Sequence, residues 1–266
     1  MNLDELRKLQ NTQYEMLKAV VAICEKNNIY YSLAFGTLLG AVRHQGSIPW
    51  DNDVDIFIKR EQIEEFYNLM KDHLPSNLFC EMMCAGSLDY CSELRIYKSN
   101  TEMYISNYYD KSVNNCIRID VFILDYAKKH LGLAKLLVPF FYLAKLNSIE
   151  KNLLFSIHKK SKLKMAYIKF GDFLNKFISE QSFEKMMYKL SVSSKPTENR
   201  LFIVEPNKVL KAAWFDESTK LLYEDQEFLC TKYYDEFLTR EYGNYMELPP
   251  ENKRFTNAMT QYVVRF

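Results

Sequence analysis

Glycine and proline are both scarce in this chain, with seven of each among 266 residues. Collagen-like, low-complexity and turn-dominated architectures need more of them and are excluded. A charge excess is missing too, because 35 basic side chains stand against 34 acidic ones, for a net charge of +1. No long-range field therefore draws the chain to nucleic acid, and any basic patch must be local.

An export signal is also lacking. Asp4 and Glu5 occupy the place where a signal peptide carries a basic and then an apolar run. The six cysteines are scattered, and the pair Cys80 and Cys84 has no second pair to complete a metal site. We therefore expect reduced cysteines that serve packing, in a protein of the cytoplasm.

The chain does have enough hydrophobic residues for a core, and its apolar residues recur at the spacings of helices and strands. With 48% hydrophobic and 26% charged residues, it can fold as one large domain with an elaboration. Asn2 and Glu5 have the spacing of a capping box, so a helix should start there and run to Asn27. A second amphipathic helix should end before Pro75, and a short one at Gly243. Strands are expected over residues 29–34, 94–97, 103–105, 117–123, 202–204 and 221–223.

The stretch of residues 35–58 organises the rest of the chain. It predicts a short helix that opens at Gly36 and Thr37, a polar turn, and a strand that starts among carboxylates. Strand alternation places Asp53 and Asp55 on one face, roughly 6.5–7 Å apart at their Cα atoms. Backbone N–H groups at a helix start can bind phosphate, and a glycine lets the phosphate come close.

A third carboxylate is expected at Asp120. Residues 117–123 alternate so that Asp120 lies opposite the apolar face, where a carboxylate is costly unless it meets a cation. We assign Asp53 and Asp55 as metal ligands and Asp120 as a ligand or as the base. This pattern suits Mg²⁺ or Mn²⁺ and favours metal-assisted phosphoryl or nucleotidyl transfer, although paired carboxylates on strands are often simply solvated.

Four further side chains, three of them close to the carboxylates in sequence, allow two interpretations each. Arg43 and Arg95 could hold phosphate oxygens through their forked donors, or form surface ion pairs. His44 could be a base or a structural residue. Trp50 could stack on a base or on a cationic head group, or anchor the turn as a core aromatic.

The character of the sequence changes over residues 127–200, where lysines are dense. The apolar run over residues 131–149 is broken by Lys135, Pro139 and Lys145, and is too short and too charged for a membrane span. We interpret this part as a basic, apolar helical insertion. It either packs on the sheet with its lysines exposed or contacts an anionic membrane peripherally.

Motifs near both ends carry a resemblance to a known family. Residues 36–44 and 48–56, GTLLGAVRH and IPWDNDVDI, look like the signature of the LicD family, and residues 242–250, YGNYMELPP, resemble its closing motif. The family includes bacterial phosphocholine transferases and relatives of fukutin and fukutin-related protein. Asn52 stands where many members carry another aspartate. By strand parity it points away from Asp53 and Asp55, so we expect little damage to metal binding.

The resemblance implies an α/β (α+β) nucleotidyltransferase-like fold, a mixed β-sheet flanked by helices with a helical insertion. We divide the chain into a catalytic core over residues 1–126, the insertion over 127–200, and a part over 201–266 that completes the active site. The resemblance also implies an acidic triad of Asp53, Asp55 and Asp120. The implied donor is CDP-choline or another CDP-alcohol. Its phospho-alcohol passes to a glycan or lipid-linked glycan with release of CMP, at the inner face of the cell membrane.

Other functions remain open on the sequence. The chain could move a nucleotidyl group from an NTP to a small molecule and release pyrophosphate, or it could be a non-catalytic adaptor that docks on membranes. The transferred alcohol could be choline, ribitol, glycerol or ethanolamine. A quaternary ammonium favours an aromatic cage, for which Tyr108, Tyr109 and Trp214 are candidates near expected loops.

Overall fold

The computed structural model describes residues 1–83, 87–105, 114–137, 177–201, 208–254 and 262–266, and the single positions 166, 169 and 173. The chain divides into two compact units: Met1–Glu81, Glu93–Leu124 and Lys211–Phe266 form the first, and Met82–Ser92 and Asp125–Leu210 the second. Several predictions lie outside the described residues: the strand over 202–204, Cys84, Tyr108, Tyr109 and most of the proposed insertion.

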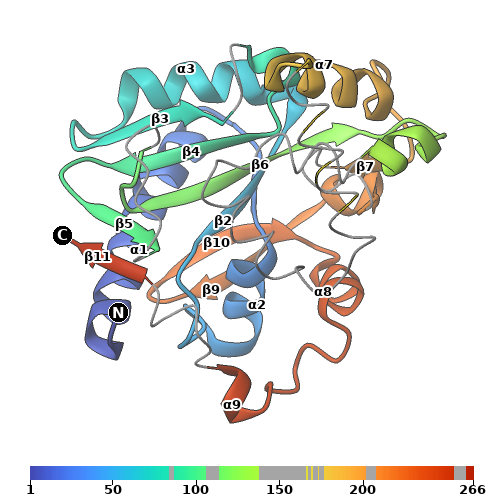
Figure 1. Ribbon diagram of the computed structural model, residues 1–266. Helices are drawn as coiled ribbons and strands as arrows, with labels where there is room; N and C mark the ends of the chain where they lie inside the picture. Colours follow the sequence, from blue (N-terminus) through green and yellow to red (C-terminus); the bar gives the residue numbers. More distant parts are fainter. Residues whose placement is uncertain are drawn as a thin grey trace. The chain divides into compact units, whose positions relative to one another are not determined.

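The first unit contains the mixed sheet and, among the described residues, every α-helix labelled in Figure 1 except α7. Its helices are α1 Leu3–Lys26, α2 Phe35–His44, α3 Ile63–His73, α8 Tyr234–Tyr242 and α9 Glu251–Arg254, with 3₁₀ turns η1 Arg60–Gln62 and η3 Ala212–Phe215. Its strands are β1 Tyr31–Leu33, β2 Asp55–Lys59, β3 Leu78–Met82, β4 Glu93–Lys98, β5 Glu102–Ile105, β6 Arg118–Tyr126, β9 Ser218–Tyr223, β10 Gln226–Thr231 and β11 Tyr262–Arg265. The residues of β3 and β6 beyond Glu81 and Leu124 belong to the second unit.

Local sequence signals set the ends of α1, α3 and α8. The Asn2 side chain accepts from the Glu5 amide at 2.8 Å, and the Glu5 side chain accepts from the Asn2 amide at 2.8 Å, which confirms the predicted capping box. Helix α3 ends two residues before Pro75, and α8 ends against Gly243, whose φ of 67° suits glycine. The predicted boundaries of these helices are confirmed.

The main sheet has the strand order β1-β2-β6-β4-β3. Strands β2 and β6 run parallel, whereas β1–β2 and β4–β6 are antiparallel, so the sheet is mixed as expected. The register places Asp55 opposite Asp120, and Asp120 opposite Arg95. The alternation predicted for residues 117–123 is confirmed, because Ile119 and Val121 are fully buried and Asp120 lies on the other face.

The acidic loop, which we define as residues 45–54, joins α2 to β2. Strand β2 begins at Asp55, so the prediction that Asp53 belongs to the strand is wrong. The physical reason is a turn in which the Asp51 amide donates to the Ile48 carbonyl at 2.9 Å, which keeps this segment from extending. The parity argument for Asn52 fails with it.

An aromatic cluster centred on Phe57 lies on the same face of the sheet as Asp55. The Phe57 ring centroid is 5.1 Å from Phe35, 5.7 Å from Phe215, 5.9 Å from Phe237 and 6.4 Å from Phe122. Most of these pairs meet edge to face, the arrangement that aromatic rings prefer. The cluster fixes the start of α2 and the middle of α8 next to Asp55 and Asp120, the paired carboxylates of β2 and β6 that we call the acidic row.

The second unit is built around α7 Glu180–Ser191 and β7 Asn199–Leu201, with η2 Leu88–Tyr90 and the short β8 Leu210–Lys211, whose last residue belongs to the first unit. Its core consists of Ala127, Leu131, Ala134, Phe183, Met187, Val192 and Leu201. Throughout the described part of the chain, no helix is long and apolar enough to span a bilayer. The five cysteines that the structure describes are free thiols, as expected.

Candidate active site

A cavity of about 470 Å³ in the first unit joins the two motif regions. One wall comes from α2, the acidic loop and Asp55 at the start of β2, and the other from residues 242–249, which are the last residue of α8 and the segment after it. Of the predicted site residues, Gly36, Arg43, Trp50, Asp53 and Asp55 line this cavity, whereas Thr37, Arg95 and Asp120 do not. The arrangement brings the signature and closing motifs together, although they lie almost two hundred residues apart in the sequence.

Thr37 is buried and has a defined structural task. Its side chain is 3% exposed, and its Oγ1 accepts from the Asp55 amide at 2.8 Å. The threonine therefore closes the start of β2 and fixes the backbone that carries Asp55. Phosphate binding by Thr37 stays a prediction.

Replacing Thr37 by valine should destabilise the first unit. Valine keeps the shape but removes the acceptor, so the buried Asp55 amide loses its partner, at a cost of about 1–3 kcal/mol. Thr37→Ser keeps the hydroxyl and should lose much less. Urea unfolding of the two variants measures the difference, and equal losses would contradict this role of the hydroxyl.

Asp120 meets cations, as its position in an apolar strand requires. Its Oδ1 accepts from Arg118 Nε at 3.1 Å and forms an ion pair with Arg95 Nε at 2.8 Å, while Arg95 Nε donates to Glu93 Oε1 at 2.8 Å. Burial alone would lower the pKa of Arg95, but Glu93 and Asp120 outweigh it and raise the pKa above its ordinary value. Of the two interpretations of Arg95, the structure shows the ion pair.

The carboxylates of Asp51 and Asp53, in the acidic loop, and of Asp55, at the start of β2, crowd together at the cavity. Burial, followed by the charges of neighbouring carboxylates, raises the pKa of Asp51 and of Asp55 well above the usual range. The pKa of Asp53 is raised too, chiefly by desolvation of its carboxyl group and then by the charge of Asp120. A Cβ on Gly36 would lie 2.5 Å from Asp51 Oδ2, so only glycine leaves room for this carboxylate.

Asp51 is the site residue that the sequence interpretation missed. A signal was present, because Asp51, Asp53 and Asp55 follow each other at every second position. The strand model selected only the two residues nearest the apolar run. Tyr242 was also missed, although the closing motif contains it; burial and then the charges of Asp51 and Asp55 raise the pKa of its phenol.

The donor chemistry of Asp53 and Asp55 fits a hard divalent cation. Asp55 is buried and Asp53 is exposed at the cavity, and a cation would relieve the repulsion between their carboxylates. Across the described residues, no three His, Cys, Asp or Glu side chains form a ready set of metal ligands. Mg²⁺ is commonly held by one or two carboxylates, with waters and substrate phosphates completing its shell. The two aspartates fit this mode of binding.

Arg43 ties α2 to the opposite wall of the cavity. Its Nη1 donates to the Tyr245 carbonyl at 2.6 Å and to the Glu247 carbonyl at 3.5 Å. The Tyr245 hydroxyl donates to Asp235 Oδ1 at 2.6 Å, which anchors the same segment to α8. The closing motif is thus held in place by backbone contacts of an arginine from the signature motif.

His44 and Trp50 pack against each other, with ring centroids 5.8 Å apart and the rings edge to face. Burial and the adjacent Arg43 lower the pKa of His44, and Arg43 Nε donates to its Nδ1 at 3.4 Å. These contacts favour the structural interpretation of His44. The Arg254 guanidinium lies 5.6 Å from the Trp50 centroid.

Trp214 is not part of an aromatic cage at this site. Its ring is 5% exposed and packs on Phe237, and its Nε1 donates to Glu236 Oε2 at 3.0 Å. Nor does Trp214 line the cavity. The prediction failed because a tryptophan near an expected loop is as often a core residue as a binding residue.

Comparison with known proteins agrees with the two motifs. Residues 28–131 match the family model described as LicD/FKTN/FKRP, nucleotidyltransferase domain. Over 257 residues the chain is 26% identical to Lipopolysaccharide cholinephosphotransferase LicD of Haemophilus influenzae, which covers 92% of this chain and 93% of that protein. A protein of Rickettsia typhi is 32% identical over 104 residues, 38% of this chain and 34% of its own length. Ribitol 5-phosphate transferase FKRP of Homo sapiens is 45% identical over 49 residues, 18% of this chain and 10% of that protein.

The matched segment contains the helix start at Gly36, the acidic loop and the strand of Asp120, which are the parts that build the cavity wall and the acidic row. The comparison therefore agrees with the family expected from the motifs, and the mixed sheet agrees with the fold that this family implies. The chain thus matches the LicD/FKTN/FKRP family over its nucleotidyltransferase domain, residues 28–131, and resembles a LicD transferase over 92% of its length.

Proposed function

We propose that this chain moves a phospho-alcohol, phosphocholine or a relative of it, from a CDP-linked donor to a hydroxyl group, with release of CMP. The acceptor in this proposal is a cell-surface glycan or its lipid-linked precursor. The observation that carries the proposal is the cavity in which Asp51, Asp53 and Asp55 face the closing motif. The alignment with a cholinephosphotransferase over 92% of the chain supports it.

The acidic loop is suited to the diphosphate end of such a donor. Asp53 and Asp55 would hold Mg²⁺ or Mn²⁺, which when bound neutralises the diphosphate and stabilises the departing phosphate. Arg43 lines the same cavity, and its hydrogen bonds to the opposite wall are made by Nη1, so among the described residues its Nη2 is left to donate to a phosphate oxygen. Asp120 remains the proposed third member of the triad, in register with Asp55 one strand away.

A base for the acceptor hydroxyl is also at hand. Asp51 binds its proton more tightly than a free carboxylate does, and such a group can take a proton from an attacking hydroxyl. Aromatic side chains of Trp50, Tyr242 and Tyr245 line the cavity. Their faces can contact a quaternary ammonium, which supports choline over a polyol as the transferred alcohol.

Incubation of the purified chain with CDP-choline, Mg²⁺ and a glycan acceptor should release CMP and leave phosphocholine on the glycan. CDP-ribitol, CDP-glycerol and CDP-ethanolamine, tested in parallel, identify the alcohol, and a chelator should stop the reaction. Pyrophosphate released from an NTP in the absence of a CDP-alcohol would favour nucleotidyl transfer instead. Failure to bind any cytidine diphosphate ligand in calorimetry would favour the non-catalytic adaptor that docks on membranes.

If the acceptor is lipid-linked, the reaction belongs in the cytoplasm at the inner face of the cell membrane. A basic insertion over residues 127–200 that contacts anionic lipid would then bring the cavity to its acceptor. Flotation of the chain with anionic vesicles, compared with neutral ones, tests this part of the proposal.

A further inference from the structure

The acidic loop is held by two buried glutamines of α1. Gln10 and Gln13 are 5% and 1% exposed. Gln10 Nε2 donates to the Ile48 carbonyl at 2.9 Å and to the Asp51 carbonyl at 2.8 Å. Gln13 Nε2 donates to the carbonyls of Asn52 and Arg118, both at 3.0 Å. Each side-chain amide therefore bridges two backbone carbonyls that are distant from it in sequence.

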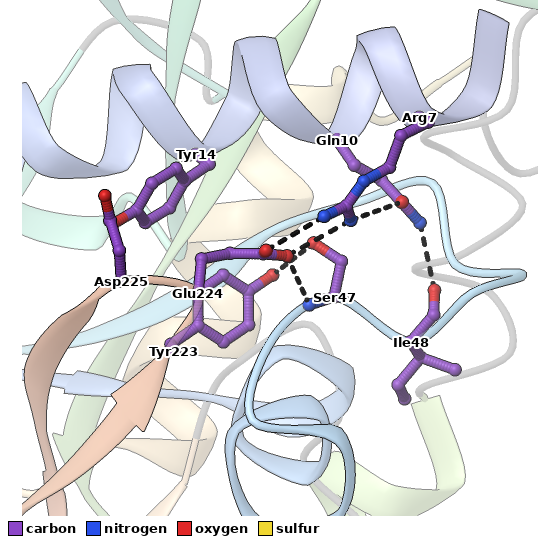
Figure 2. A network of polar contacts seen from close by, with 8 residues as sticks. All are labelled: Arg7, Gln10, Tyr14, Ser47, Ile48, Tyr223, Glu224 and Asp225. Carbon is purple, nitrogen blue, oxygen red and sulfur yellow. Dashed lines mark hydrogen bonds and ion pairs between the residues drawn. The ribbon is translucent and has the colours of Figure 1, made fainter. Parts of the chain in front are cut away.

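The bridge made by Gln10 fixes the turn that presents the site. The Asp51 amide donates to the Ile48 carbonyl at 2.9 Å, and Gln10 binds the carbonyls at both ends of this turn. Trp50 and Asp51, which line the cavity, are carried on that backbone. Figure 2 shows the Gln10 side chain reaching from α1 to Ile48.

The bridge made by Gln13 connects the two halves of the acidic set. One of its acceptors, the Asn52 carbonyl, lies between Asp51 and Asp53, and the other, the Arg118 carbonyl, lies two residues before Asp120. The same NH₂ group therefore sets the spacing between the acidic loop and β6. A shift of either segment would break one of its two hydrogen bonds.

Gln13 makes these bonds at a cost. Its Oε1 is buried and finds no hydrogen-bond partner within the described structure. The amide cannot turn round to satisfy this oxygen, because Oε1 would then face two carbonyl oxygens. An apolar side chain of similar shape would avoid the penalty of a buried, unpaired acceptor. The position thus gives up stability for two hydrogen bonds, one to the acidic loop and one to β6.

A second anchor holds the other end of the acidic loop. Glu224, in the β9–β10 turn, accepts from Arg7 Nη2 at 2.9 Å and from the Ser47 amide at 3.0 Å. Arg7 Nη1 also donates to Gln10 Oε1 at 3.4 Å, which orients the Gln10 amide toward its carbonyls. Figure 2 shows these side chains meeting above the loop.

We propose that Gln10 and Gln13 are positioning residues of the active site: they hold the backbone of Asp51 and Asp53 at a fixed place relative to Asp120. Neither glutamine lies in the segment 28–131 that matches the family model. The kinetic part of this proposal rests on the proposed function. The structural part does not, because it can be read from the mobility of the acidic loop alone.

Gln10→Met and Gln13→Met test the proposal, since methionine keeps the length of the side chain but donates nothing. Gln62→Met is the matched control. Gln62 also bonds twice to backbone, donating to the Asn28 carbonyl at 3.1 Å and accepting from the Tyr30 amide at 2.9 Å, but it does not line the cavity. Thermal unfolding, turnover with the CDP-alcohol and hydrogen–deuterium exchange are measured on all three variants of the full chain.

Gln10→Met and Gln13→Met should each lose about 10- to 100-fold in kcat, and their KM for the donor should stay within about threefold of that of the unmodified protein. Amide exchange over residues 46–53 should speed up at least tenfold, while the control keeps both kcat and exchange there, whatever its melting temperature. Unchanged exchange in the loop, or kcat losses that follow melting temperature in all three variants, would overturn the proposal. If no CDP-alcohol is turned over at all, the proposed function fails. The exchange measurement still decides whether Gln10 and Gln13 hold the acidic loop in place.

Discussion

Replacing Asp55 by asparagine should remove nearly all transfer activity and at the same time make the protein harder to unfold at neutral pH. Asp55 is 8% exposed, lies opposite Asp120 and lines the cavity. Asparagine has the same shape and can keep the backbone bond to Thr37, but it cannot neutralise a cation. Loss of one electrostatic contact of this kind typically lowers turnover on the order of 10²–10³-fold.

The gain in stability follows from the charges around Asp55. Burial, and then the carboxylates of Asp53, Asp120, Asp51 and Glu93, raise its pKa well above the usual range. A carboxyl that binds its proton more tightly in the folded protein contributes stability at low pH, and that stability is lost as pH rises through the folded pKa. Asparagine has no proton to lose. The variant should therefore melt higher than the unmodified protein at pH 7–8, and both should melt alike below about pH 4.

Differential scanning calorimetry over this pH range, with and without Mg²⁺, measures the difference. Mg²⁺ should narrow the gap, because a ligand that binds only the folded, unmodified protein stabilises it. Asp72→Asn, an exposed aspartate on α3, is the control and should change neither turnover nor melting. Full activity of Asp55→Asn would refute the role of Asp55, and a lower melting temperature at pH 8 would refute the repulsion.

The parts of the fold that the sequence predicted are those encoded by neighbouring residues. The capping box of Asn2 and Glu5 and the alternation around Asp120 each depend on spacings of two to four residues, and both are confirmed. The family motifs work in the same way, since each is a continuous run. Local patterns therefore led to the helix starts, the strand faces and one wall of the cavity.

The parts that escaped prediction depend on contacts across the chain. Gln10 and Gln13 look like polar positions on a surface helix, and only the folded chain reveals that they lie 1–5% exposed against a loop some forty residues away. Arg95 could not be assigned either, because its ion pair with Asp120 depends on the register of two strands. Asp53 was placed in the strand because alternation does not show where a turn interrupts it.

Gly36→Ala should lower turnover without lowering stability, whereas a typical core mutation lowers stability. The new Cβ would lie 2.5 Å from Asp51 Oδ2 and 3.6 Å from its Cγ, and no backbone atom outside the adjoining helix comes within 4 Å. The Asp51 side chain can rotate away, so the helix accepts the methyl group and gains about 0.5–1 kcal/mol from the better helix former. Asp51 then leaves its place beside Asp53, and displacement of a site group by about 1 Å can cost on the order of 10²-fold in rate.

Two other glycines serve as controls for this prediction, because a Cβ at each of them would meet different atoms. A Cβ on Gly40, in the same helix, would lie 2.5 Å from the Gly46 carbonyl oxygen, which is backbone and cannot rotate away; Gly40→Ala should therefore lower the melting temperature. A Cβ on Gly132 meets nothing within 4 Å, so Gly132→Ala should be neutral for both properties. If Gly36→Ala lost stability as Gly40→Ala does, the strain would lie in the backbone of α2. If it kept full turnover, Asp51 would have no part in the reaction, and the glycine would serve only to make room for it.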